Sequence, residues 1–157
     1  MVSAVADAKG RIATTTGAPV LDSNGVLLQL ADALTALDYQ VEKSKTATDK
    51  IARPVLFGDE GTAGVTMEID AFHDGQGIAV EVEAGRAWNG NAVYRDLVRT
   101  SLLLDANFLA LLLPIAYAPP SAKTPVPAYA YSRDLLDAIY ASQRLRLPFE
   151  GVLLIGY

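Results

Sequence analysis

Two neighbouring stretches, Val65-Thr66-Met67-Glu68-Ile69-Asp70-Ala71-Phe72 and Ile78-Ala79-Val80-Glu81-Val82-Glu83, decide the expected fold. In each stretch apolar and polar residues alternate with a period of two, which is typical of a half-buried β-strand. The residues between them include Asp74-Gly75-Gln76-Gly77, whose side chains favour a tight turn. The sequence therefore predicts a β-hairpin whose turn spans residues 74–77.

This turn fixes which residues of the two strands lie opposite each other. The expected pairs are His73 with Ile78, Ala71 with Val80, Asp70 with Glu81, Ile69 with Val82, and Glu68 with Glu83. One face of the hairpin is then apolar, and the other carries four carboxylates. Because like charges directly opposite each other destabilise a sheet, the four acids indicate a bound cation or shifted pKa values. The plain alternative is a polar strand face in contact with water.

Composition indicates one folded domain over residues 1–157 and limits the kinds of ligand. Hydrophobic residues make up 51% and charged residues 20% of the chain, which is typical of a globular protein with a sizeable core. The formal net charge of −5 argues against nonspecific coating of nucleic acid, although it leaves a local basic groove open. With no cysteine and a single histidine, His73, we expect any metal to be held by oxygen atoms.

The rest of the chain predicts helices and further strands around the hairpin. Residues 1–22, rich in Ala, Thr and Gly, are expected to be loosely ordered. The further elements expected are a helix from about Gly25 with Leu27, Leu30 and Leu34 on one face, a strand at 39–43, a helix at 91–105 with Asn91, Arg95 and Arg99 on one face, a buried strand at 108–113, a helix at 132–143 and a strand at 149–157. This order predicts an α/β fold. Without a signal peptide or a membrane-spanning segment in the sequence, we expect a cytoplasmic protein that does not contact the membrane.

The hairpin also carries a resemblance to a known family. Asp70, followed eleven residues later by Glu81-Val82-Glu83 on the next strand and then by a helix and a buried strand, resembles the PD-(D/E)XK nuclease superfamily. The resemblance covers roughly residues 26–113. It implies the restriction-endonuclease-like fold, a mixed β-sheet flanked by helices on both faces. Most members carry Lys where this chain has Glu83, and the Glu-x-Glu variant is similar to that of BamHI-like restriction enzymes.

The resemblance implies an endonuclease or related phosphodiesterase that cleaves DNA with Mg²⁺ or Mn²⁺ and acts as a homodimer. In that family pattern Asp70 and Glu81 would bind the ion, with the carbonyl of Val82 as a further ligand. Glu83 would assist the activation of water. Glu68 would contact the residues that bind the ion without binding the ion itself. The residues expected to contact phosphate or DNA are Lys43, Arg86, Asn91 and Arg95.

The sequence is also compatible with two other classes of function. A catalytically silent nuclease-fold module for binding or assembly is favoured by the acidic pI, the missing lysine and the short chain. A sugar hydrolase that uses paired carboxylates is less favoured, because such pairs lie in a deep cleft where one acid stays protonated. The sequence shows no obvious aromatic platform for a sugar beside the acids.

Overall fold

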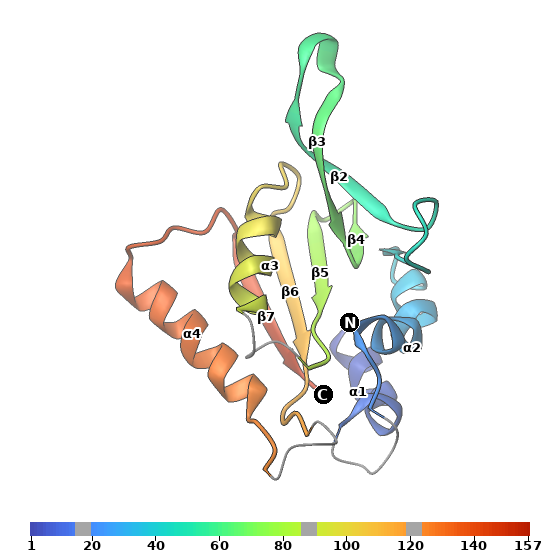
Figure 1. Cartoon of the computed structure of the whole chain (residues 1–157), viewed down its shortest axis with the longest axis vertical. Helices are drawn as coiled ribbons and strands as arrows, with labels where there is room; N and C mark the ends of the chain where they lie inside the picture. The colour runs from blue at the N-terminus through green and yellow to red at the C-terminus, as the bar shows by residue number, and fades with distance from the viewer. Residues whose placement is uncertain (15–19, 86–90, 119–123) are drawn as a thin grey trace.

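The computed structural model describes residues 1–14, 20–85, 91–118 and 124–157. Its elements are α1 (Val2–Ile12), α2 (Ser23–Thr35), β1 (Gln40–Val41), β2 (Ile51–Phe57), a short 3₁₀ turn (Asp59–Gly61), β3 (Ala63–Ile69), β4 (Ala71–His73), β5 (Ile78–Val82), α3 (Ala92–Ser101), β6 (Phe108–Leu113), α4 (Ala128–Ser142) and β7 (Gly151–Gly156). Figure 1 shows a central sheet between helices and a two-stranded ribbon that projects from it. The predicted α/β class is confirmed. None of the helices in these four stretches is long and apolar enough to cross a lipid bilayer.

The central sheet is mixed and has the strand order β1-β4-β5-β6-β7. Strands β1, β4 and β5 pair antiparallel, whereas β6 and β7 continue the sheet in parallel with β5. Strand β6 lies between two parallel neighbours, and all its residues after the first are buried. Its unbroken apolar run was expected to form such a strand, because a strand covered on both faces has no polar side.

Helices cover both faces of this sheet, because side chains along each strand point alternately to opposite sides. On one face, Val80 and Leu112 pack with apolar side chains of α1 and α2. On the other face, Leu109 and Leu111 pack with apolar side chains of α3 and α4. The two pairs of helices lie on opposite sides of the strands in Figure 1. This arrangement leaves β5 between α2 and α3, where its one polar residue, Glu81, has little access to water.

The hairpin forms with the predicted turn, but its pairing is shorter than expected. His73 pairs with Ile78 and Ala71 with Val80, as the position of the turn predicted. Gly77 adopts φ +63° at the turn, where an added Cβ would lie 2.6 Å from the carbonyl oxygen of Asp105. The glycine is therefore required both by backbone conformation and by lack of space.

The three outer pairs expected for the hairpin are wrong. At Asp70 the chain bends, and β3 leaves the central sheet to pair with β2 instead. In this second sheet Ile69 lies opposite Ile51 and Glu68 opposite Ala52, so Glu68 does not face Glu83. The sequence analysis did not foresee β2, and this strand takes the place that β5 was expected to hold. Strands β2 and β3 together form a two-stranded antiparallel ribbon, defined here as residues 51–69.

The N-terminal segment also differs from expectation. Residues 1–22 were expected to be loosely ordered, but Val2–Ile12 form a helix whose buried residues are Val5, Ala8 and Ile12. Their spacing places them on one face of the helix, and this face packs against α2 in the core. Helix α2 begins at Ser23, because the side chain of Asp22 accepts a hydrogen bond of 2.7 Å from the backbone N–H of Gly25.

Candidate functional site

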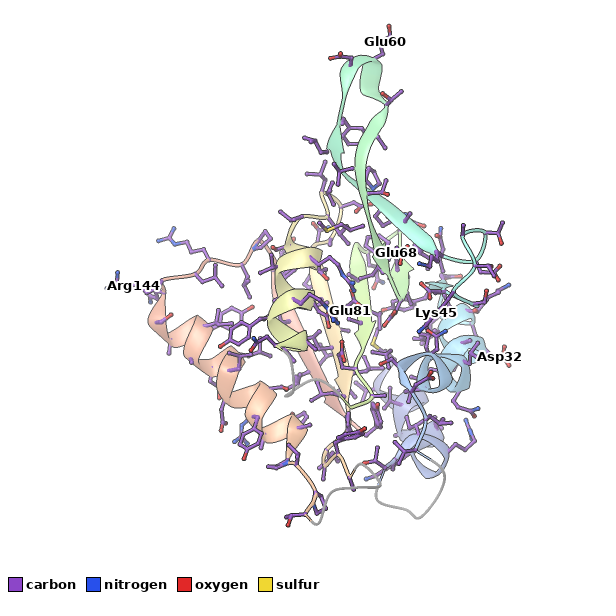
Figure 2. All side chains as sticks on the ribbon, in the orientation of Figure 1. Asp32, Lys45, Glu60, Glu68, Glu81 and Arg144 are labelled. Atoms are coloured by element: carbon purple, nitrogen blue, oxygen red, sulfur yellow. The ribbon has the colours of Figure 1, made fainter. Side chains whose placement is uncertain are left out.

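A polar cavity of about 340 Å³ lies where the base of the ribbon, the hairpin and α3 meet. The acidic residues that line it are Glu42, Glu68, Asp70, Glu81 and Glu83, and the basic residues are Lys45, Lys50, Arg95 and Arg99. Figure 2 labels Glu81 beside α3, Glu68 near the base of the ribbon, and Lys45 over α2. The three acids that the sequence analysis placed in the site, Asp70, Glu81 and Glu83, therefore share one cavity.

The bend at Asp70 places its carboxylate in the cavity. The Oδ2 atom of Asp70 accepts a hydrogen bond of 2.7 Å from the backbone N–H of Val82. Glu81 lies in β5 and is almost completely buried, with its side chain on the face covered by α3. Glu83 follows the strand, and its N–H donates to the carbonyl oxygen of Leu112 at 2.8 Å. The hairpin and the central strand β6 thus fix the positions of all three acids.

Helix α3 supplies two arginines that contact these acids. Arg99 forms an ion pair and a hydrogen bond with Glu81. One turn earlier, Nη2 of Arg95 lies 2.7 Å from Oε1 of Glu83. Between them, the completely buried Asp96 lies within ion-pair distance of both guanidinium groups. The positive charges of α3 therefore offset part of the negative charge of the sheet.

The sequence analysis gave no role in the site to Glu42, Asp96 or Arg99. Asp96 is three residues after Val93 and one before Leu97, so the apolar stripe of α3 itself places this carboxylate in the core. That pattern was a usable signal for a buried acid. Arg99 was expected on the face of Arg95, but its partner depends on how α3 packs on the sheet. Glu42 directly follows a two-residue strand and carries no comparable signal.

Burial and mutual repulsion raise the pKa values of the acids. Burial, together with the charge of Glu42, raises the pKa of Asp70 to about 6, although the hydrogen bond from Val82 opposes this. Burial and the neighbouring Asp70 raise the pKa of Glu81 well above its usual range. The pKa of Glu83 rises to about 7, through burial and then through the neighbouring carboxyl group of Asp96. The carboxyl groups are thus close enough to affect one another, which favours uptake of protons or of a cation.

The donor set and the charge of the site suit a hard divalent cation. With Asp96, six carboxyl groups meet four basic side chains, which leaves two negative charges in excess if all are ionised. Oxygen ligands of this kind are those that Mg²⁺ and Mn²⁺ prefer. The Oδ2 atom of Asp96 is also buried without a hydrogen-bond partner. In the described part of the chain, however, no three potential ligands already converge on one point. An ion at this place therefore requires Arg99 or Arg95 to release a carboxylate.

The other residues proposed from sequence lie in different surroundings. Glu68 is at the half-exposed edge of the cavity, and both its carboxylate oxygens accept hydrogen bonds from Nζ of Lys50, at 2.6 and 2.7 Å. Lys43 and Asn91 are exposed and do not line the cavity. Asn91 instead precedes α3 with a left-handed backbone, φ 58°. Arg86 lies outside the described residues. Of the four expected phosphate contacts, the structure therefore places Arg95 at the cavity.

Comparison of the whole chain with protein-family models, with curated proteins and with solved structures gave no match. The cavity and the residues that line it are therefore the basis for inferring a function.

Proposed function

We propose that this protein is a PD-(D/E)XK-type nuclease that cleaves DNA phosphodiester bonds with Mg²⁺ or Mn²⁺. One observation carries the proposal: Asp70, Glu81 and Glu83 line a single polar cavity. The strand of Glu81 is followed by α3 and by the buried parallel strand β6, which is the order that the sequence resemblance requires. Activity on both strands of a duplex would require two copies of the site, and we expect a homodimer in the cytoplasm.

Each acid has a role that its surroundings favour. Asp70 and Glu81 would hold the ion, because both are fixed by the backbone of the hairpin and point into the cavity. The carbonyl of Val82 is proposed as a further ligand. Glu83, whose pKa is raised to about 7, suits the transfer of a proton from water near neutral pH. The ion would lower the pKa of a water molecule and offset negative charge on the phosphate.

The basic residues of the cavity take the place of the lysine that most members of the family carry. Arg99 and Arg95 hold two of the acids in ion pairs, and binding of a divalent cation would free their guanidinium groups. A freed arginine beside the acids would then stabilise the charge of the phosphate in the transition state. Lys50, at the edge of the cavity, offers a further positive charge.

The direct test is a nuclease assay with Mg²⁺ or Mn²⁺ on single-stranded, nicked and branched DNA. We expect Glu81→Gln to lower the rate by roughly a hundredfold or more, because it removes a charged ligand while keeping the shape of the side chain. Glu150→Gln, at an exposed position far along the chain, is the matched control and should keep the wild-type rate. Equal cleavage by the wild type and by Glu81→Gln would disprove the proposal.

One observation favours a second function, a nuclease-fold module that binds or assembles without catalysis. Glu81 and Glu83 are already neutralised by Arg99 and Arg95, as in a site that needs no metal to be stable. Titration calorimetry separates the two functions. The nuclease should give a heat of binding with Mn²⁺ that Glu81→Gln abolishes, whereas the silent module should give none.

A further inference from the structure

The outer half of the ribbon exposes apolar side chains to solvent. Figure 1 shows β2 and β3 extending away from the rest of the molecule. The side chains in question are Leu56, Phe57 and Val65, which are 60%, 51% and 44% exposed. A two-stranded ribbon alone is only marginally stable in water, and a cluster of exposed apolar residues indicates a contact surface. We therefore expect another surface to cover this half of the ribbon.

The charge of the tip restricts the kind of partner. Asp59 and Glu60 form the turn between the two strands, and Figure 2 shows Glu60 at the end of the ribbon. Neither side chain takes part in an ion pair with any residue of the described part of the chain. An acidic tip is repelled by nucleic acid phosphates, so the ribbon is not suited to DNA. A suitable partner has an apolar pocket with positive charge beside it.

The chain itself carries such a pocket at the end of α4. This α4 cavity has a volume of about 300 Å³ and is lined by Tyr140, Gln143, Leu145, Arg146 and Leu147. Tyr140 and Leu145 are about half exposed. Arg146 and the neighbouring Arg144 form no ion pair with the residues that the structure describes. The α4 cavity thus combines apolar walls with two positive charges that have no acidic partner.

The ribbon tip and the α4 cavity belong to separate parts of one molecule. Figure 2 shows Glu60 at the tip of the ribbon and Arg144 beyond the end of α4, far apart across the view. A ribbon therefore does not reach the α4 cavity of its own chain, but two copies can each offer a ribbon to the other. Such an exchange gives a closed two-fold dimer with two identical contacts.

We propose that a second copy of this chain receives the ribbon, with Leu56 and Phe57 in its α4 cavity and the acidic tip beside Arg144 and Arg146. The apolar side chains of the ribbon lose contact with water in this arrangement, which stabilises the dimer. The opposite charges guide the two surfaces together and exclude the reverse pairing of two tips. None of these residues lines the candidate site, so the proposal does not depend on nuclease activity.

Two charge-reversed variants test the contact. The tip variant is Asp59→Arg with Glu60→Arg, and the cavity variant is Arg144→Glu with Arg146→Glu. Sedimentation or light scattering should give the wild type about twice the mass of the 16.7 kDa chain. Each variant alone should dimerise with a dissociation constant on the order of a hundredfold weaker, because like charges then meet at both contacts. An equal mixture of the two variants should recover the dimer, because both contacts again join opposite charges.

A matched control reverses an exposed ion pair on α4, through Arg133→Glu with Asp134→Arg. This control should leave the dimer unchanged. Circular dichroism confirms that each variant is folded. A monomeric wild type overturns the proposal, and so does a dimer that neither reversal weakens. A mixture of the two variants that stays monomeric overturns it as well. A nuclease assay of the same samples reports separately on the proposed function, because the substitutions lie outside the candidate site.

Discussion

The carboxylate of Asp70 accepts a hydrogen bond from the backbone N–H of Val82, over 2.7 Å. This bond forms where strand pairing stops and β3 turns away into the ribbon. It connects the base of the ribbon to the strand that carries Glu81. The hydrogen bond from Val82 thus holds Asp70 next to β5 in place of the strand pair that was expected between Asp70 and Glu81. It also keeps the carboxylate of Asp70 inside the cavity, beside Glu81.

We predict that the protein without divalent cations becomes less stable as pH rises from about 4 to about 7. The folded-state pKa values of Asp70 and Glu83 are raised to about 6 and about 7, from ordinary values of 3.8 and 4.5. In this window the folded state keeps protons that the unfolded state has lost, so the free energy of unfolding falls as pH increases. The raised pKa of Asp70 alone corresponds to on the order of 3 kcal/mol. Urea unfolding in chelator across this range measures the effect, and a stability that increases with pH would contradict it.

We predict that Asp70→Asn stabilises the protein at pH 8 in chelator, by on the order of 1–3 kcal/mol. The substitution removes a buried charge, and the amide oxygen can still accept the hydrogen bond from Val82. Under the proposed function, Mg²⁺ should reverse the order. The wild type would then gain stability by binding the ion, about 4.1 kcal/mol at a thousandfold excess over its dissociation constant, and the variant would not.

Thermal unfolding with and without Mg²⁺ gives both results from the same samples. Asp7→Asn, at an exposed position on α1, is the control and should leave the melting temperature unchanged in both conditions. If Asp70→Asn instead lowers the melting temperature in chelator, the charged carboxylate stabilises the folded state. The proposed repulsion among the buried acids is then wrong.

We predict that Arg99→Met destabilises the protein at pH 8 by about 3–5 kcal/mol. The substitution removes the ion-pair partner of the buried Glu81 and one of the two guanidinium groups beside Asp96. Adding Glu81→Gln to this variant should restore much of the loss, because no unpaired carboxylate then remains at that position. Denaturant unfolding of the four members of this double-mutant cycle measures the coupling.

The exposed ion pair between Arg133 and Asp134 provides the comparison for this cycle. Arg133→Met should change the free energy of unfolding by no more than about 0.5 kcal/mol, since solvent screens that pair. If the effects of Arg99→Met and Glu81→Gln simply add, the contact between the two side chains contributes nothing and the prediction fails.

Local patterns in the sequence predicted those parts of the fold that local interactions determine. The turn at residues 74–77 formed as expected, and so did the strand at Phe108–Leu113, whose apolar run has no polar side. Strand β2 was missed because Arg53 and Pro54 interrupt its pattern. Proline is tolerated there because the second sheet has only two strands, so each strand keeps a free edge.

The sequence was enough to predict most of the acids that line the candidate site, but not which basic side chains form ion pairs with them. Position relative to the turn was enough to bring Asp70 near Glu81, even though the expected pairing did not form. The partner of Arg99 depends on the height and rotation of α3 on the sheet, which no local pattern specifies. Glu42 reaches the same cavity because its N–H donates to the carbonyl oxygen of Asp70, a contact between segments 28 residues apart.

Helix α1 provides the last prediction, because residues 1–22 were expected to be only loosely ordered. We predict that Ile12→Ala lowers the free energy of unfolding by about 2–4 kcal/mol, through lost apolar contacts and the cavity left behind. Ile12 is 2% exposed and packs in the same core as Leu30 and Val80. Val2→Ala on the same helix is the control, since Val2 is 58% exposed, and it should cost less than about 0.5 kcal/mol. Equal and small effects of the two substitutions in urea unfolding would mean that α1 is not part of the core. A large effect of Ile12→Ala alone would mean that one face of the central sheet depends on this helix, and with it the strand that carries Glu81.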